Sequence, residues 1–288
     1  MEIKKPNFII IGAAKCGTST LSRVLAEHPD CCFSRPKEVR FFYDDNNYSK
    51  GWEWYKKAFT HYNNELVVGE STPAYSDRVL HPETAKRIHQ FNPNMKLIYI
   101  VRDPYEKLVS TWRMWARLNF PVARRGINYF FEHESNNKWS TVKSCCYSYQ
   151  LDAYKQYFPE DAFLIIFLEE LSREPLQQYK RVFQFLKLEP SKFDWNNIHI
   201  KENGADQHYK TSKYWTYLQQ SRMRPLVKNV LPTTLIRLAT QLVGPKKIFV
   251  PREELSEENK KEFYRIIKPD ALAFLEKQGK QADYWAMM

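Results

Sequence analysis

Short apolar runs alternate along the chain with segments in which apolar residues recur at helical spacing. The runs are rich in β-branched and aromatic residues, which predicts buried strands at residues 8–11, 31–33, 66–69, 95–101 and 162–167. The intervening segments predict amphipathic helices, because their apolar residues return every three or four positions. This alternation is typical of an α/β fold, and we expect three layers, with a parallel sheet flanked by helices.

The later part of the chain is less regular. Helices are expected at residues 81–90, 105–118, 147–158 and 175–186. Segment 126–139 mixes polar and aromatic residues and predicts either an irregular flap or a helix. Periodicity fails over 191–213, which indicates a long loop. Its Lys201 and Lys210 suit a flap that closes over a phosphate, and a solvated connector is an equal alternative.

Residues 214–288 are helical in pattern and basic, with a hairpin expected near 245–251. No internal repeat or clear boundary interrupts the chain, so we expect a single domain over residues 1–288. No signal peptide or transmembrane run is visible, and we expect a cytoplasmic protein.

The loop after the first predicted strand is the strongest candidate for chemistry. It reads GAAKCGTST from Gly12, and a helical pattern follows it. In such a strand-loop-helix turn, backbone N–H groups and the helix dipole create a hollow that binds anions. The loop also supplies a cation at Lys15, close backbone approach at Gly17 and hydroxyl donors at Thr18, Ser19 and Thr20.

This loop differs from the phosphate loop of nucleotide triphosphatases, in which Lys directly precedes the hydroxyl residue. Here Lys15 precedes Gly17. An ordinary turn with an incidental Lys is the alternative. Cys16 lies inside the loop, and we expect its thiol to have a lowered pKa and to be readily alkylated. The cysteine spacing suggests neither a disulfide framework nor a zinc site.

Further polar residues follow other predicted strands. Glu38 stands in a loop before Phe41 and Phe42, where a carboxylate near the Lys15 loop suits a general base; a solvated Glu is the alternative. Arg102 directly follows the strand at 95–101, a position that favours an anion ligand over a structural ion pair. Ser110 reaches the same anion only if the chain bends at Pro104.

Overall charge narrows the range of partners. The 288 residues carry a formal net charge of +11, which predicts an anionic partner. Nucleic acid, an acidic membrane surface, an anionic polysaccharide and a nucleotide all satisfy this criterion. The basic residues are spread along the chain instead of clustering in one helix, which argues against a nucleic-acid-binding module.

A set of motifs occurs in fixed order: GAAKCGTSTL, PKEVRFF, NNYSKGWEWY, GESTPAY and IVRDPYEKLVSTW. The set resembles the sulfotransferases that use 3′-phosphoadenosine 5′-phosphosulfate (PAPS), and it looks closest to the heparan sulfate and related carbohydrate branch. The resemblance runs from Pro6 to about Leu171 and more weakly to Trp285. It implies a P-loop NTPase-like sulfotransferase fold, PAPS as sulfonyl donor, 3′-phosphoadenosine 5′-phosphate (PAP) as product, and no metal.

The resemblance also implies roles for individual residues. Glu38 would be the general base, and Lys15 would stabilise the leaving phosphate. Arg102 and Ser110 would hold the 3′-phosphate. The 5′-phosphosulfate would be held by loop residues Lys15, Cys16, Gly17, Thr18, Ser19 and Thr20.

The acceptor side departs from the heparan-type pattern. Those members often have His and Asp where this chain has Arg40 and Tyr43, and 3-O-sulfating relatives have Lys in place of Ser71. We expect Arg40, Tyr43, Ser71 and Tyr75 to contact the acceptor, with Arg40 favouring an anionic one.

We therefore expect a soluble, bacterial-type enzyme that sulfates a hydroxyl or amine of a small metabolite or carbohydrate. Neither nucleic acid nor a membrane is an expected partner, and no oligomeric state is predicted. A P-loop kinase-like enzyme and a non-catalytic polyanion-binding protein are the alternatives.

Overall fold

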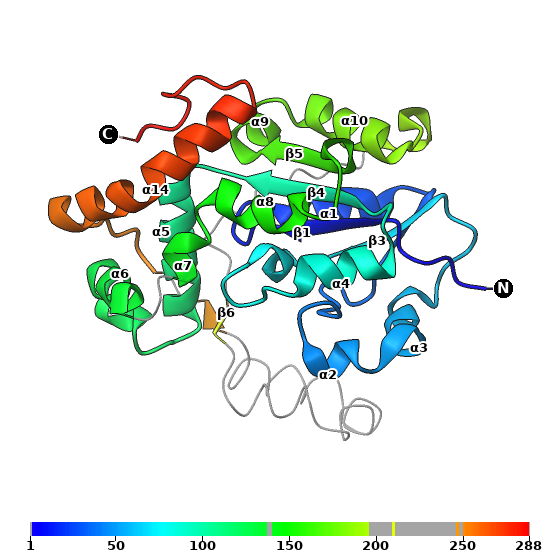
Figure 1. The fold of residues 1–288 in the computed structure, drawn as a ribbon, viewed down its shortest axis with the longest axis horizontal. Coiled ribbons are helices and arrows are strands. Elements are labelled where there is room, and N and C mark those ends of the chain that lie inside the picture. Colours follow the sequence, from blue (N-terminus) through cyan, green and yellow to red (C-terminus); the bar gives the residue numbers. More distant parts are fainter. Residues whose placement is uncertain (1, 137–139, 196–208, 211–245, 248–249, 288) are drawn as a thin grey trace.

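The computed structural model describes residues 2–136, 140–195, 209–210, 246–247 and 250–287 (Figure 1). A five-stranded parallel sheet lies at its centre, with strand order β2-β3-β1-β4-β5. Its strands are β1 (Phe8–Gly12), β2 (Cys31–Phe33), β3 (Val67–Ser71), β4 (Lys96–Val101) and β5 (Phe163–Phe167). The predicted parallel α/β fold is confirmed, and every predicted strand is present.

Strand β1 occupies the middle of the sheet. Phe8 is in register with Gly69 of β3 on one side and with Lys96 of β4 on the other. The chain therefore builds β2 and β3 to one side of β1 before it crosses to β4. Ligands of open α/β sheets bind outside the carboxyl ends of the strands where the order reverses, which is here between β1 and β4.

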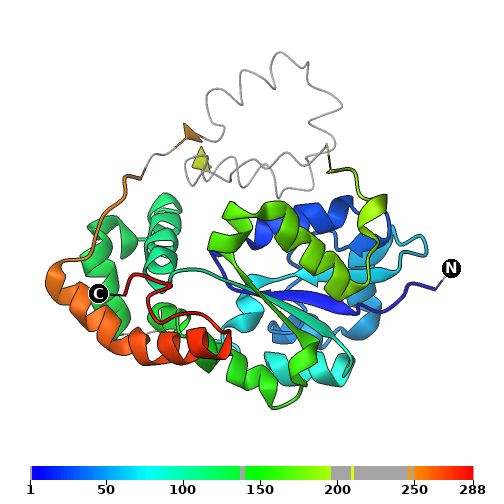
Figure 2. The same cartoon turned by 90° about the horizontal axis from the view of Figure 1, so that it is seen from above.

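Helices cover both faces of the sheet. Figure 2 shows α1 (Thr18–Glu27) and α10 (Pro175–Leu186) on one face, and α4 (Thr84–Phe91) and α8 (Tyr147–Lys155) on the other. Further helices are α2 (Asp45–Tyr48), α3 (Gly51–Tyr55), α6 (Ile127–Asn136), α7 (Ser140–Lys143) and α9 (Leu168–Arg173). These layers agree with the predicted three-layer arrangement.

Helix α5 (Pro104–Arg117) stands at the edge toward which the strand arrows point in Figure 1. Helix α14 (Glu257–Lys277) packs against α8. After α14, the indole of Trp285 is 2% exposed and stacks on Phe274 with a centroid distance of 6.1 Å. It also lies 5.6 Å from the ring of Tyr147 at the start of α8, so the end of the chain joins the core.

Some predicted elements differ from those observed. Helix α4 begins at Thr84 instead of residue 81, and residues 127–136 form helix α6 where a flap was the alternative, while residues 137–139 lie outside the described residues. The predicted local hairpin near 245–251 is wrong, because β7 (Lys246–Lys247) pairs antiparallel with β6 (Tyr209–Lys210). A turn pattern shows where a strand starts, but it cannot identify a partner that is distant in sequence.

Gly12, the last residue of β1, lies where the chain passes close to a neighbouring loop. A Cβ atom there would lie 2.2 Å from Ser76 Oγ and 3.1 Å from Tyr99 Cε2. We expect Gly12→Ala to lower the free energy of unfolding by about 1–3 kcal/mol, because overpacking displaces neighbouring atoms. Urea denaturation measures the loss. Ser76→Gly removes the nearer obstacle, so the double variant should recover part of the stability. An equal cost in both backgrounds would contradict this explanation.

Candidate functional site

The loop after β1 has the backbone expected of an anion-binding turn. The amide of Ala13 donates to Ile100 O of β4 at 2.7 Å, which ties the loop to the neighbouring strand. Gly17 precedes α1 with a φ of 90°, and a Cβ there would lie 2.7 Å from the Leu168 side chain. In the described part of the chain, no backbone carbonyl accepts the amides of Gly17, Thr18 or Ser19. These donors are therefore available to an anion.

Lys15 supplies the positive charge of this loop. Burial lowers the pKa of its ammonium group, and the positive charges of Arg117 and Arg102 lower it further. No carboxylate is among the groups whose charge acts on Lys15 in the described structure. A partly buried cation beside other cations is costly unless an anion joins it.

Arg102 follows β4 directly and lies against the same loop. Its Nη1 donates to Lys15 O at 3.3 Å, and its Nη2 donates to Glu106 Oε2 at 3.3 Å. The Tyr147 hydroxyl donates to Arg102 O at 2.7 Å and accepts from Arg102 N at 3.3 Å. Arg102 Nε is buried with no hydrogen-bond partner among the described residues. An unsatisfied guanidinium donor beside Lys15 fits a phosphate group.

One face of α5 extends the cationic region. Glu106, Ser110, Arg113 and Arg117 are spaced by four, three and four positions, so they share a helix face. The positive charges of Arg102 and Arg117 both lower the pKa of Lys15, and Arg102 also donates to Lys15 O. This face of α5 is therefore directed toward the loop. Ser110 is half-buried in the middle of it.

The segment after β7 lies along the same face. Arg252 donates to Glu106 at 2.5 and 3.0 Å, and Arg113 donates twice to Val250 O, at 3.2 and 3.0 Å.

Sequence reasoning missed Arg117, Tyr147 and Arg252. The helical spacing from Ser110 to Arg117 was a usable signal for Arg117, whereas nothing local marks Tyr147 or Arg252.

The expectation for Cys16 is wrong. Its side chain is 0% exposed, and burial raises the pKa of the thiol to about 11. The Sγ atom contacts the Tyr147 hydroxyl at 3.8 Å. The nearby positive charges of Lys107 and Arg102 oppose the effect of burial without reversing it. The thiol therefore packs beneath the loop, and only its backbone can serve an anion.

Glu38 lies in the loop that follows β2, and that loop approaches the start of α1. Lys37 Nζ donates to Ser19 Oγ at 3.3 Å and forms an ion pair with Glu38 at 3.6 Å. Glu38 is also paired with Arg40 at 3.8 Å, and its side chain is 41% exposed. The structure thus brings the predicted base beside the anion loop, with its carboxylate open to solvent.

The predicted acceptor residues fall into two groups. Arg40 is exposed, and Tyr43 is half-buried and stacks on His81 with a centroid distance of 4.2 Å. Ser71 and Tyr75 are 0% and 1% exposed, which leaves them no surface for direct contact with an acceptor. The predicted Lys201 and the side chain of Lys210 lie outside the described residues.

The described ranges contain no group of three or more His, Cys, Asp or Glu side chains arranged to hold a metal ion. None of their helices has the length and apolarity needed to cross a membrane.

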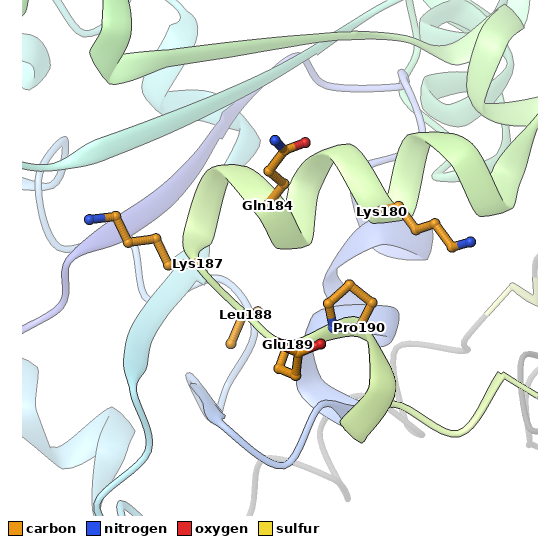
Figure 3. Close-up of a pocket in the computed structure, with 6 residues that line it drawn as sticks. All are labelled: Lys180, Gln184, Lys187, Leu188, Glu189 and Pro190. Carbon is orange, nitrogen blue, oxygen red and sulfur yellow. The ribbon is translucent and has the colours of Figure 1, made fainter.

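A separate hollow of about 610 Å³ lies at the end of α10 and the turn after it (Figure 3). Its lining residues are Lys180, Gln184, Lys187, Leu188, Glu189 and Pro190. None of the residues described above lines this hollow, so it is not part of the candidate site.

Taken together, the parallel sheet and the cationic loop at its carboxyl edge define an α/β protein that binds a phosphorylated ligand. Comparison with known proteins identifies the family. The chain belongs to the sulfotransferase domain family, whose model matches residues 5–230. Members of this family use PAPS as donor.

Two of the relatives that match are a heparan sulfate sulfotransferase and a membrane-associated sulfotransferase. Heparan sulfate glucosamine 3-O-sulfotransferase 5 of Mus musculus is 32% identical over 199 residues, which are 66% of this chain and 56% of the relative. Membrane-associated sulfotransferase kil1 of Dictyostelium discoideum is 33% identical over 161 residues, which are 54% of this chain and 32% of that protein. The match thus spans only about half, or less, of these relatives.

A solved structure supports the fold. The sulfotransferase from Alicyclobacillus acidocaldarius superposes with a TM-score of 0.64 at 21% identity, covering 97% of this chain and 98% of that one. The predicted family resemblance and the predicted sulfotransferase fold are therefore confirmed.

The lowered pKa of Lys15 predicts how PAP binding depends on pH. A bound anion favours the protonated amine, so binding needs an added proton once the pH exceeds the lowered pKa of the free protein. Below that pKa, we expect the charge of Lys15 to make a constant contribution to PAP affinity. Above it, we expect PAP affinity to fall by up to about tenfold per pH unit. Calorimetric titration with PAP across neutral and alkaline pH, in buffers of different ionisation enthalpy, measures both quantities.

Lys15→Met should weaken PAP binding and remove the proton uptake. Lys96→Met is the matched control, because burial also lowers the pKa of Lys96, which lies at the opposite end of β4 from the site. Proton uptake that persists in Lys15→Met would assign the effect to another group.

Proposed function

We propose that the protein is a PAPS-dependent sulfotransferase that moves a sulfonyl group to a hydroxyl or amine of a small metabolite or carbohydrate. One observation carries the proposal. Lys15 stands beside Arg102 and Arg117 with no carboxylate acting on it in the described structure, while the carboxylate of Glu38 approaches from the adjacent loop. A cationic donor site with a carboxylate base on the neighbouring loop is what sulfonyl transfer requires.

The donor would bind across the loop after β1 and the start of α5. The amides of Gly17, Thr18 and Ser19, together with Lys15, suit the 5′-phosphosulfate. Arg102, whose Nε has no hydrogen-bond partner among the described residues, and Ser110 suit the 3′-phosphate. When bound, the nucleotide supplies the sulfonyl group and a phosphate leaving group.

The residues of this chain would then handle the proton and the charge. Glu38 Oε1 or Oε2 accepts the proton of the attacking hydroxyl or amine. The Lys15 ammonium offsets the negative charge that develops on the leaving phosphate oxygen. The contact of Lys37 with Ser19 keeps the two groups on neighbouring loops, which lowers the entropic cost of bringing base and donor together.

Exposed residues beside Glu38 bear on the acceptor. The Arg40 side chain is 59% exposed and reaches Glu38, so an anionic group on the acceptor would be attracted there. Tyr43 and His81 present a stacked pair next to Arg40, a surface of the kind that sugars or rings contact. The names of the heparan sulfate relatives support a carbohydrate acceptor.

Calorimetric titration with PAP, 5′-AMP and ATP, each with and without magnesium, tests the donor assignment. We expect binding that requires the 3′-phosphate and is independent of magnesium. Arg102→Ala should weaken PAP binding about tenfold or more and leave the weaker 5′-AMP binding within about twofold, because only PAP carries the 3′-phosphate. Magnesium-dependent binding of ATP would favour a kinase-like enzyme, and binding of polyanions without these nucleotides would favour the polyanion-binding alternative.

Glu38→Gln tests the base. We expect PAP release from PAPS, measured with an acceptor found by screening hydroxyl- and amine-bearing carbohydrates and metabolites, to fall by at least about 100-fold. PAP affinity should stay within about twofold, because the donor contacts are on other residues. Glu53→Gln, an exposed Glu paired with Lys56 on the surface, is the control and should keep full turnover. Near-normal turnover in Glu38→Gln would exclude it as the base.

A further inference from the structure

Residues 39–42 of the loop that carries Glu38 are held by side chains, whereas Lys37 O accepts from the backbone amide of Ser71 in β3 at 3.4 Å. The amide of Val39 donates to Glu70 Oε2 at 3.3 Å, and the amide of Arg40 donates to Thr72 Oγ1 at 3.3 Å. The amides of Phe41 and Phe42 donate to the Tyr75 hydroxyl, at 2.9 and 3.3 Å. Every backbone donor from residue 39 to residue 42 therefore ends on one segment, residues 70–75.

Glu70 is the centre of this segment. Its side chain is 0% exposed, and Oε2 accepts from the Thr72 hydroxyl at 2.6 Å. Oε1 accepts from the hydroxyls of Tyr55 and Tyr75, each at 2.8 Å. Every one of these partners is a donor, so the arrangement is satisfied by an ionised carboxylate. Burial raises the pKa of Glu70, and these hydrogen bonds oppose that effect.

The hydrogen bonds form chains that run in one direction. The Phe41 and Phe42 amides donate to the Tyr75 hydroxyl, and that hydroxyl donates to Glu70. The Arg40 amide likewise donates to Thr72 Oγ1, which donates to Glu70. A charged acceptor at the end of each chain strengthens every bond within it.

The part of the loop held in this way includes Arg40, which is proposed to contact the acceptor. Arg40 has a φ of 60°, a conformation that favours glycine and needs outside support in other residues. Its side chain and that of Glu38 point into solvent and pair with each other, so neither anchors the backbone. The buried side of the loop supplies that support through Glu70, Thr72 and Tyr75.

We infer that Glu70 is a positioning residue for the transfer reaction, which holds the Glu38 loop through Thr72 and Tyr75. This inference rests on the proposed function. Glu70 touches neither donor nor acceptor, because it has no exposed surface. Tyr75 thereby acquires a role different from the acceptor contact predicted for it, since its hydroxyl orders the loop backbone.

A pair of tyrosines provides a matched test. Tyr55 and Tyr75 are both buried and donate to the same Glu70 oxygen at the same 2.8 Å, but only Tyr75 also accepts loop amides. Tyr55→Phe and Tyr75→Phe therefore remove the same bond to Glu70, and only Tyr75→Phe releases the loop. Hydrogen exchange at residues 39–42 measures that release directly, without any acceptor.

We expect exchange at residues 39–42 to speed up at least about tenfold in Tyr75→Phe and to stay within about twofold in Tyr55→Phe. With PAPS and a screened acceptor, Tyr75→Phe should lower kcat about tenfold or more at unchanged PAPS KM, while Tyr55→Phe keeps kcat. Glu70→Gln should lower kcat by up to about 100-fold, because the NH₂ group of Gln is itself a donor and would face the hydroxyls or the amide that donate to Glu70. PAP affinity should be unchanged in each folded variant.

Equal exchange and equal kcat in the two Phe variants would overturn the inference, because a purely structural carboxylate affects both alike. Normal kcat in a folded Glu70→Gln would also overturn it. Failure of the unsubstituted protein to bind PAP or to release it from PAPS would instead overturn the proposed function and the role in transfer that rests on it. The exchange comparison would then still decide whether Glu70 anchors the loop.

Discussion

Parallel strands end together at one edge of the sheet, and beyond that edge the ladder no longer satisfies the backbone. Each loop there must find other partners for its amides and carbonyls, since a buried unpaired group is costly. In the loop after β1, the amide of Ala13 donates to Ile100 O. The amide and the carbonyl of Arg102 are both hydrogen-bonded to the Tyr147 hydroxyl. The loop after β2 uses the Glu70 segment. In the described part of the chain, the amides of Gly17, Thr18 and Ser19 have no backbone acceptor, and they lie in the loop proposed to bind the donor.

The two sides of the site balance charge in opposite ways. Near the donor, Lys15 has cationic neighbours and no acid acting on it in the described residues, so its charge awaits a ligand. On the acceptor side, Glu70 is a fully buried acid whose lone pairs are occupied by hydroxyls and an amide. The first arrangement favours an incoming anion, and the second gives rigidity without affinity for any ligand.

How much the sequence could predict depends on the range of the interactions involved. The strands and the loop at Lys15 follow from local periodicity and glycine placement, the positions of Arg102 and Glu38 in the sequence mark them as candidates, and the family motifs add support for their roles. The Glu70 network joins residues that are distant along the chain, and nothing in GESTPAY says that its Glu is buried. The error at Cys16 has the same origin. Loop position suggested an exposed thiol, whereas burial raises the pKa of the Cys16 thiol to about 11, although its contact with the Tyr147 hydroxyl opposes that effect.

The segment before α14 is joined to the proposed donor site through Glu106. This carboxylate lies between Arg102 and Arg252, with contacts of 3.3 Å to the first and 2.5 and 3.0 Å to the second. A single negative charge cannot neutralise two guanidinium groups, and the tighter, bidentate contact goes to Arg252. Arg102 is therefore the less satisfied of the two, which agrees with its unpaired Nε. Glu106 orients Arg102 toward the loop without quenching its charge, and leaves that charge available to a phosphate.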